Sequence, residues 1–527
     1  MNISPSKTFN KNASKIYITL IIIAFIITFG HFLLYYNVFY STSDEGYLWY
    51  NVLMIQAGKI PILDIQSYDP FRFYFCILVT LFFGSGIIGI RVAMTIVQFF
   101  SIYVGLLIFN RVNKKLTLHL ILAFVMVLWF FPYHKSMDIA LSVFSIYFAL
   151  ILLENKEKGL FYLIYGVFTG FSAFIGRNAG LYNIIIFLGL FSIIWIQDKK
   201  MFHIKFIFKK LALWSIGIFI GYLPMIIMFI TLPKFFQNYV DINFDMINRG
   251  SSNLPLPIPW PFIMLKAGIH NLWDFSIFLT GLYFVFFPII YIAGLIYGTL
   301  KKNEYILVCS ITGIIYMHYA FSRADLGHVA HSVLPLMLLI FGIASMTYLP
   351  KIATWLTIIL TTVDVIFSAG LNGRVYLKFA TNLENYELPS TKELILTPQD
   401  IISLYSEYNN IKLKYMMQGK ELLIAPYFPG VYPMLGLECP VYYTYFLHKA
   451  PHNRQLKAIE DIKQNDVKYI ILSNSYIDGR EELSFQNTFN LVYDYIYQEF
   501  TPSYSHKLPD GYTFFIRTDL LKLITIK

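Results

Sequence analysis

The stretch "IYITLIIIAFIITFGHFLLYYNVFYSTSDEGYLWYN" (residues 16–51) joins a long apolar run to two adjacent carboxylates. The run 16–36 is long enough to cross a bilayer as a helix, and no small-residue cleavage site follows it, so we expect a retained anchor. Asp44 and Glu45 follow as the chain leaves this run, and charges near lipid are costly to hold. The stretch predicts a membrane protein with an acidic pair at one membrane surface.

The composition of the whole chain is typical of a polytopic membrane protein. Of its 527 residues, 57% are hydrophobic and only 14% are charged, and the mean hydropathy is +0.58. The net charge of +10 is the kind of excess that cytoplasmic loops supply. No Lys/Arg cluster is interleaved with stacking aromatics, which argues against nucleic-acid binding. Three cysteines are too few for a disulfide framework and lack the spacing of a zinc site.

Apolar runs and their breakers predict about eleven membrane spans. We place them at residues 16–36, 87–109, 117–133, 139–153, 160–176, 180–196, 211–231, 276–299, 305–321, 331–349 and 352–370. The run 71–83 is too short to cross comfortably, and we expect it to lie along the interface. The predicted fold class is an α-helical polytopic membrane protein. Its transmembrane domain covers 1–370, with a first outer loop at 41–86, and a soluble α/β domain follows at 371–527.

The distribution of Lys and Arg predicts the orientation in the membrane. Short turns such as "RVNKK" (111–115), "ENKEK" (154–158), "QDKKMFHIKFIFKK" (197–210) and "KKNE" (301–304) are basic, as cytoplasmic turns are. The N-terminus is then expected in the cytoplasm and the C-terminal domain outside, in a bacterial cytoplasmic (inner) membrane. Ionisable groups from several loops fall on the outer side, while the spans themselves are nearly free of charges.

Asp44 and Glu45 have a structural and a functional interpretation. Residues 41–44 can cap a helix expected from Glu45 to Ala57, and acidic residues favour helix N-termini. Alternatively, one carboxylate acts as a general base while the other positions it or helps to hold a metal.

Two further outer turns carry charged side chains beside apolar runs. In "FPYHKSMDIALS" (131–142), Asp138 can cap the next helix, or act with His134 and Lys135 on a phosphate and a nucleophile. In "FIGRNAGLYN" (174–183), Arg177 can simply snorkel to the interface, or bind an anion.

The turn "FSRADLGHVAHSVLP" (321–335) collects Arg323, Asp325, His328 and His331. The two histidines are three residues apart and share a helix face, but a metal site there lacks a third nearby ligand. The structural alternative is an ordinary interface loop.

These side chains suit group transfer from a phosphate-activated lipid. A phosphate leaving group needs cations around it, best supplied by arginine and lysine, and the incoming nucleophile needs one base. A glycosidic-bond hydrolase would instead need two carboxylates at a defined separation.

The acidic pair after the first span, the stretch "GKIPILD" (58–64), the segment 71–83 and Asp138 after the third span together resemble GT-C glycosyltransferases. Within that superfamily the layout is similar to the family-39 type: protein O-mannosyltransferases and the enzymes that add aminoarabinose to lipid A. The resemblance covers residues 16–200 best. It implies a polyprenyl-phosphate sugar as donor, reaction on the outer side of the membrane, and inversion at the anomeric carbon.

The resemblance also implies residue roles. Asp44 matches the catalytic base, Glu45 the second member of the acidic pair, and Asp138 a second acidic position that orients the acceptor or a metal. Members differ in their need for a divalent metal ion, so a metal is left open. Phosphate binding is assigned on chemistry alone, to Arg72, Lys135, Arg177, Arg323 and His328.

The sequence therefore predicts an inverting membrane glycosyltransferase with a glycolipid, polysaccharide or protein acceptor. The alternative is a transporter or flippase of lipid-linked sugars, which should carry charges in the middle of its spans. A surface-polysaccharide polymerase or ligase fits the early acidic pair and the C-terminal domain less well.

Overall fold

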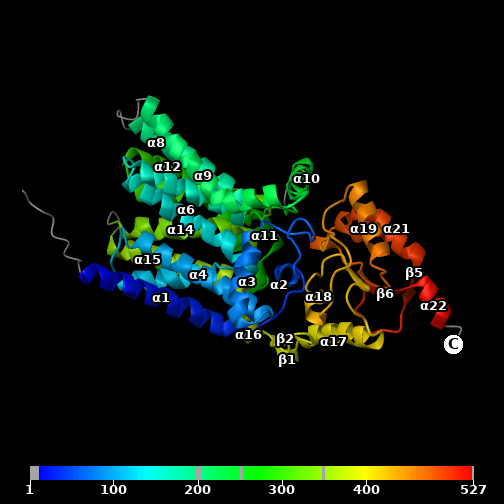
Figure 1. Cartoon of the computed structure of the whole chain (residues 1–527). Helices are drawn as coiled ribbons and strands as arrows, with labels where there is room; N and C mark the ends of the chain where they lie inside the picture. The colour runs from blue at the N-terminus through cyan, green and yellow to red at the C-terminus, as the bar shows by residue number, and fades with distance from the viewer. Residues whose placement is uncertain (1–10, 198–203, 250–252, 347–349, 525–527) are drawn as a thin grey trace, which may run out of the picture. The chain divides into compact units, whose positions relative to one another are not determined.

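The computed structural model describes residues 11–197, 204–249, 253–346 and 350–524 (Figure 1). The chain divides into two compact units. The first comprises Met1–Tyr35, Met94–Thr231 and Met246–Leu377, and the second comprises Tyr36–Ala93, Leu232–Asp245 and Lys378–Lys527. Residues 36–93 and 232–245 thus group with the C-terminal residues, whereas the sequence led us to place them with the spans. The predicted division of the chain at residue 370 stays a prediction.

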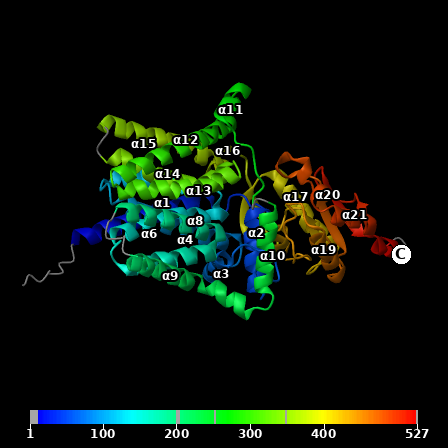
Figure 2. The ribbon, with the colours of Figure 1, turned by 90° about the horizontal axis from the view of Figure 1, so that it is seen from above.

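The first unit is a helical bundle. Its elements are α1 (Lys11–Tyr35), the later part of α4 (Ile87–Phe109), α5 (Leu116–Leu128), η1 (Tyr133–Lys135), α6 (Ser136–Glu154), α7 (Gly159–Ile175), α8 (Arg177–Gln197), α9 (Ile204–Thr231), α11 (Pro261–Ala267), α12 (Leu272–Leu300), α13 (Glu304–Ser322), α14 (Leu326–Ser345), α15 (Lys351–Val365), the π-helical η3 (Ile366–Gly370) and the start of α16 (Arg374–Ala380). Helix α13 packs against α12 and α14 (Figure 2).

Among the described residues, nine helices are long and apolar enough to cross a membrane. The other two predicted spans correspond to the shorter apolar helices α5 and α7. Every predicted span therefore coincides with a helix, and the chain is an integral, multi-pass membrane protein. The end of the predicted span 331–349 and part of the turn 197–210 lie outside the described residues.

Local sequence explains where several of these helices begin. The side chains of Asn271, Asn303 and Asp325 accept hydrogen bonds from the backbone N–H groups of Asp274, Ile306 and His328, so each caps the helix that follows. Helix α14 begins at Leu326 for this reason, five residues before the start of the predicted span.

Helices α7 and α9 approach closely through glycines spaced four residues apart. A Cβ atom added at Gly166 or Gly170 would lie 2.1 Å from a backbone oxygen of α9, and one at Gly217 or Gly221 would lie 2.3 or 2.1 Å from one of α7. This is the small-residue packing typical of membrane helices.

The second unit contains α2 (Asp44–Gln56), α3 (Phe71–Phe83), the start of α4, α10 (Phe235–Asn248) and the C-terminal α/β region. That region comprises β1 (Glu384–Glu387), β2 (Leu394–Thr397), α17 (Gln399–Lys414), β3 (Leu422–Ala425), α18 (Val431–Leu435), α19 (His452–Gln464), β4 (Tyr469–Ser473), α20 (Phe485–Thr488), α21 (Asn490–Glu499), β5 (Phe500–Ser503), β6 (Tyr512–Arg517) and α22 (Thr518–Ile524). The predicted α/β character is confirmed.

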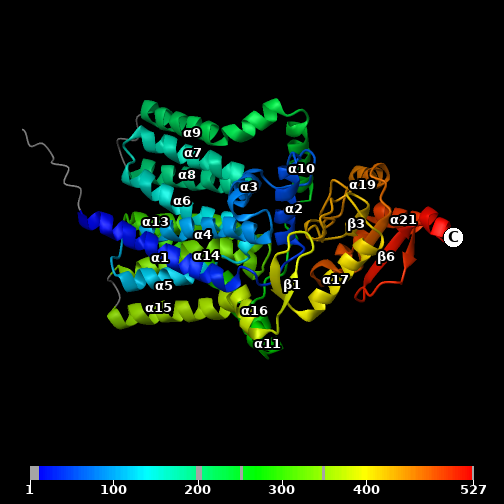
Figure 3. The same ribbon diagram turned by 60° about the horizontal axis from the view of Figure 1, so that its bottom comes forward.

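Four strands form one sheet in the order β3-β4-β6-β5, and its last strands are red in Figure 3. Strands β3 and β4 are parallel, while β6 is antiparallel to both β4 and β5. The predicted helix–turn–strand unit at 459–473 corresponds to α19 and β4. The helix predicted from Glu45 to Ala57 corresponds to α2, and the segment 71–83 is α3. That α3 lies along the membrane interface stays a prediction.

Candidate active site

The Asp44 carboxylate lies at the start of α2 and is held by two tyrosines. Its Oδ1 atom accepts a short hydrogen bond from the Tyr427 hydroxyl and one of 3.3 Å from the Tyr445 hydroxyl. Burial and the Asp44 charge raise the pKa of Tyr427 well above its ordinary value, so this hydroxyl stays protonated and donates. The ring of Tyr445 stacks on Tyr47, one turn along α2, with 4.2 Å between centroids. The carboxylate is therefore fixed in direction.

The structure does not support the simple capping interpretation of the residues before α2. The N-cap residue is Ser43, and its side chain makes no capping hydrogen bond. Asp44 is instead the first helical residue, and its Oδ1 is directed to tyrosines that lie about 400 residues away along the chain, at separations of 383 and 401.

Glu45 forms a buried ion pair with Arg91. The Nε and Nη2 atoms of Arg91 each lie 2.9 Å from one carboxylate oxygen of Glu45, and both residues are at most 2% exposed. Arg91 also donates to the carbonyl oxygens of Tyr36 and Phe39. The two-point pair ties the start of α4 to the start of α2 and to the chain between α1 and α2.

Backbone contacts lock the chain before α2 to the segment that carries Tyr427. The Gly430 N–H donates to the Thr42 carbonyl oxygen at 2.7 Å, and the Tyr40 hydroxyl donates to the Gly430 carbonyl oxygen at 2.7 Å. A Cβ atom added at Gly46 would lie only 2.4 Å from the Gly430 Cα. These contacts place Asp44 beside its tyrosine partners.

Arg72, on α3 of the same unit, is half-buried beneath an aromatic ring. Its guanidinium carbon lies 5.2 Å from the centre of the Tyr68 ring. Among the predicted site residues, Asp44, Glu45 and Arg72 therefore belong to the second unit. The remaining predicted residues belong to the first unit.

Three predicted residues of the first unit share one polar cluster. The Lys135 Nζ lies 3.4 Å from His328 Nε2, and His328 Nδ1 lies 2.8 Å from Asp325 Oδ1. The Arg323 Nε donates to Asp325 Oδ2 at 2.7 Å. Burial alone would raise the pKa of Asp325, but the hydrogen bonds and charge of His328 and the Lys135 charge lower it below its ordinary value. One ionised carboxylate thus orients an imidazole between two cationic side chains.

Asp138 and Arg177 lie at neighbouring helix starts in the first unit. Asp138 is in the first turn of α6 and 9% exposed. A Cβ atom added at Gly176, the residue before Arg177, would lie 3.4 Å from Asp138 Oδ1. The Asp138 charge also acts on the buried side chains of His331 and Tyr182. Arg177 itself is half-buried.

Within the described ranges, no three His, Cys, Asp or Glu side chains are arranged to hold a metal ion. The divalent metal that the resemblance left open stays open, and no step proposed below passes through a metal.

The sequence analysis missed several of these partners. Tyr427 and Tyr445 lie in the aromatic-rich segments "APYFPG" (425–430) and "YYTYF" (442–446), and aromatic content was the only signal for them. Asp364, inside the span at α15, was also passed over. It is half-buried and accepts a short hydrogen bond from the Tyr283 hydroxyl, so the spans do contain an ionisable side chain.

This chain resembles known proteins in its structure and not detectably in its sequence. No protein-family model matches the sequence, and no curated protein matches it. The structure is similar to that of ArnT from Cupriavidus metallidurans bound to undecaprenyl phosphate. The TM-score is 0.51 at 11% identity, over 94% of this chain and 97% of that one.

Two further solved structures resemble this chain. ArnT from the same organism in the apo state gives a TM-score of 0.51 at 11% identity, over 96% of this chain and 98% of that one. The oligosaccharyltransferase of Archaeoglobus fulgidus gives a TM-score of 0.45 at 12% identity, over 88% of this chain and 70% of that one. ArnT is a GT-C glycosyltransferase, and the match spans nearly the whole of both chains. The chain therefore has the fold of the GT-C membrane glycosyltransferases.

Proposed function

We propose that this protein is an inverting glycosyltransferase that moves a sugar from a polyprenyl-phosphate donor to an acceptor on the outer face of the membrane. The acceptor is a glycolipid, a polysaccharide or a protein. The observation that carries the proposal is the Asp44 carboxylate, fixed by two tyrosine hydroxyls at the start of α2. The GT-C fold supports it, and the ArnT structure of the same fold is described as bound to undecaprenyl phosphate.

The reaction needs one base and a stabilised leaving group. An acceptor hydroxyl attacks the anomeric carbon of the donor sugar, and the bond between that carbon and the phosphate oxygen breaks. The polyprenyl phosphate leaves with the electron pair as a stable anion, so it requires cations rather than a strong acid. The acceptor proton passes to the base as the new glycosidic bond forms. Attack opposite to the leaving group inverts the anomeric centre.

Asp44 is the general base of the proposal. Its two tyrosine donors hold the carboxylate in one orientation, which a base requires before the proton arrives. Glu45 is a positioning residue, because Arg91 occupies both of its oxygens. Asp138 is assigned to orienting the acceptor.

The donor phosphate is assigned to basic side chains. Lys135 and His328 form one hydrogen-bonded cluster with Arg323, through Asp325, and such a group offers a phosphate several donors held in fixed positions. Arg72 and Arg177 are the further cationic candidates. The carboxylate of Asp325 compensates part of the positive charge before the phosphate arrives.

A second candidate function is transport of lipid-linked sugars between leaflets. The observation that favours it is Asp364, a half-buried carboxylate inside a membrane span. Ionisable residues at such positions are rare and usually functional. A single half-buried carboxylate that accepts a hydrogen bond from Tyr283 is, however, less than the charged pathway that a transporter needs.

Reconstitution into proteoliposomes distinguishes the two functions. The protein would be incubated with a panel of radiolabelled polyprenyl-phosphate sugars and candidate acceptors, and two quantities would be followed. Release of free polyprenyl phosphate with transfer of the label supports the transferase. Movement of intact donor between leaflets, without release, would move the protein to the transporter class. Asp364→Asn should leave release intact if transfer is the function.

A further inference from the structure

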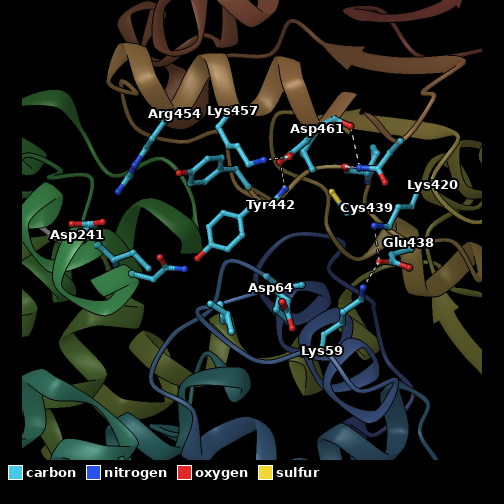
Figure 4. A pocket seen from close by; sticks show the side chains of 18 of the residues that line it. Lys59, Asp64, Asp241, Lys420, Glu438, Cys439, Tyr442, Arg454, Lys457 and Asp461 are labelled. Atoms are coloured by element: carbon cyan, nitrogen blue, oxygen red, sulfur yellow. Dashed lines mark hydrogen bonds and ion pairs between the residues drawn. The ribbon is translucent and has the colours of Figure 1, made fainter. Parts of the chain in front are cut away.

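The second unit contains a polar pocket of about 610 Å³. Its walls come from α2 and the loop that follows it, from α10, from Lys420 just before β3, and from the segment between β3 and β4. Figure 4 shows Asp241 and Arg454 at one end, Lys420 and Glu438 at the other, and Tyr442 between them. The volume lies within the range of small-molecule sites, but the lining is far more polar than is usual for apolar ligands.

The charges of this pocket nearly cancel. Its cationic side chains are Lys59, Lys420, Arg454 and Lys457. Its carboxylates are Asp64, Asp241, Asp245, Glu438 and Asp461. The pocket thus holds one more carboxylate than cations.

Each cation of the pocket already has a carboxylate partner. Lys59 and Lys420 lie 3.7 and 3.3 Å from Glu438. Lys457 lies 3.0 Å from Asp461, and Arg454 forms a close pair with Asp245. A phosphate or other anion would have to displace these partners and would meet the surplus carboxylate. The pocket therefore differs from the Lys135–His328–Arg323 cluster and does not suit an anionic ligand.

Two carboxylates of the pocket remain as hydrogen-bond acceptors. Within the described part of the chain, neither Asp64 nor Asp241 forms an ion pair, and Asp241 is exposed. Asp64 accepts one hydrogen bond, from the Ile60 N–H at 2.7 Å. The rings of Tyr442 and Tyr443 add apolar faces beside these groups. The lining therefore combines strong acceptors, ammonium and amide donors, and aromatic surface.

Hydroxyl-rich ligands require this combination. A sugar hydroxyl both donates and accepts hydrogen bonds, so it is matched by carboxylates together with amide or ammonium donors. The C–H faces of a pyranose ring pack against aromatic rings. We propose that this pocket binds a saccharide that carries no phosphate or carboxylate, either uncharged or amino-substituted, as part of the acceptor. This assignment rests on the proposed function.

The pocket shares its walls with the elements that hold Asp44. Tyr50 lines the pocket and lies six residues beyond Asp44 on α2, about 9 Å along the helix axis. The segment 439–446 contributes Tyr442 and Tyr443 to the pocket and Tyr445 to the Asp44 carboxylate. The pocket and the proposed base are therefore built from the same helix and the same C-terminal segment.

The test is saccharide binding to the full-length protein in lipid nanodiscs. A panel of uncharged, amino-substituted and anionic oligosaccharides, including maltotriose, chitotriose with free amino groups and trigalacturonate, would be titrated by calorimetry. The proposal predicts binding of an uncharged or amino-substituted member. Asp241→Asn and Lys420→Gln should each weaken that binding about tenfold, the effect of one lost charge-assisted hydrogen bond. The matched control Asp494→Asn, on exposed α21, should bind as wild type does.

The outcomes separate this proposal from the proposed function. Binding of only the anionic member, binding of none, or binding unchanged in both pocket variants would overturn the saccharide pocket. Preferential capture of a charged peptide by the pocket would also overturn it. If the uncharged saccharide binds and Asp241→Asn weakens it, the pocket stands even where no donor is cleaved. In that case only the transferase assignment fails.

Discussion

At the scale of the residue, the orientation of the Asp44 carboxylate is set by its hydrogen-bond donors and not by the adjacent Glu45. Two tyrosine hydroxyls converge on one of its oxygens, while the adjacent Glu45 is turned to Arg91. Adjacent carboxylates on a helix point in different directions, since successive residues are rotated by about 100°. The pair therefore divides into one aligned base and one structural anchor.

The tyrosines should differ in their contribution to catalysis. Tyr427→Phe removes the shorter hydrogen bond and is expected to lower kcat about 10- to 100-fold, the usual effect of one hydrogen bond to a charged group. Tyr445→Phe removes a bond of 3.3 Å and should cost less than about tenfold. Steady-state transfer assays check this, with exposed Tyr504→Phe as control. Equal losses in all three variants would refute the assignment.

Removing one partner of the buried Glu45–Arg91 ion pair should destabilise the protein strongly. Arg91→Met leaves a buried carboxylate without its partner, and we expect a loss of about 3–5 kcal/mol in the free energy of unfolding. The double variant Glu45→Leu/Arg91→Met should recover much of this loss, because no charge is then left buried. Denaturant titration in detergent measures both. If Arg91→Met lost no more free energy of unfolding than the double variant, this role of the ion pair would be contradicted.

At the scale of the element, the start of α2 is set by its close approach to the turn before α18. Gly46 and Gly430 touch through their backbones, and the hydrogen bonds around Gly430 fix the segment that carries Tyr427. This contact can only form between residues without side chains, since a Cβ on either would overlap backbone atoms.

Gly46→Ala should therefore displace α2. Overpacking against backbone costs about 1–3 kcal/mol, and a small shift of the Asp44 carboxylate away from Tyr427 should lower transfer more than 10-fold. Gly30→Ala is the matched control, because nothing lies within 4 Å of a Cβ added there in α1. It should be neutral or slightly stabilising. Thermal unfolding and transfer rates of both variants test this, and an active Gly46→Ala would show that the contact is dispensable.

The helices could be predicted from the sequence, whereas most of the side chains that contact the site residues could not. Apolar runs and their breakers predicted the helices, because hydrophobic length is a strong local signal. The contact between Asp44 and Tyr427 joins residues 383 positions apart, and no local pattern records such a pairing. Lys135, Arg323 and His328 were predicted from their charges, and Asp325 was singled out in the same turn, yet the hydrogen bond by which Asp325 orients His328 became evident only in three dimensions.

At the scale of the whole molecule, the orientation in the membrane is the main prediction still open. The basic turns predict that the N-terminus lies in the cytoplasm and residues 371–527 lie outside. The three native cysteines are free and buried, so an introduced cysteine is the main thiol that a reagent can reach.

Cysteine labelling in intact cells tests this orientation. Asp510→Cys, in an exposed loop of the C-terminal region, should react with a membrane-impermeant maleimide in intact cells. Glu157→Cys, in the exposed turn between α6 and α7, should react only after permeabilisation. The reverse pattern would place the proposed site on the cytoplasmic side and overturn the outer-face assignment.

The central claim is that Asp44 is the base of a sugar transfer from a lipid phosphate. The most direct measurement compares wild type, Asp44→Asn and the surface control Asp494→Asn, each reconstituted with the same radiolabelled donor and acceptor. The account predicts that release of polyprenyl phosphate falls at least about 1,000-fold in Asp44→Asn, at the scale of general-base catalysis, with unfolding behaviour retained and the control unchanged. Wild-type release from Asp44→Asn would contradict it.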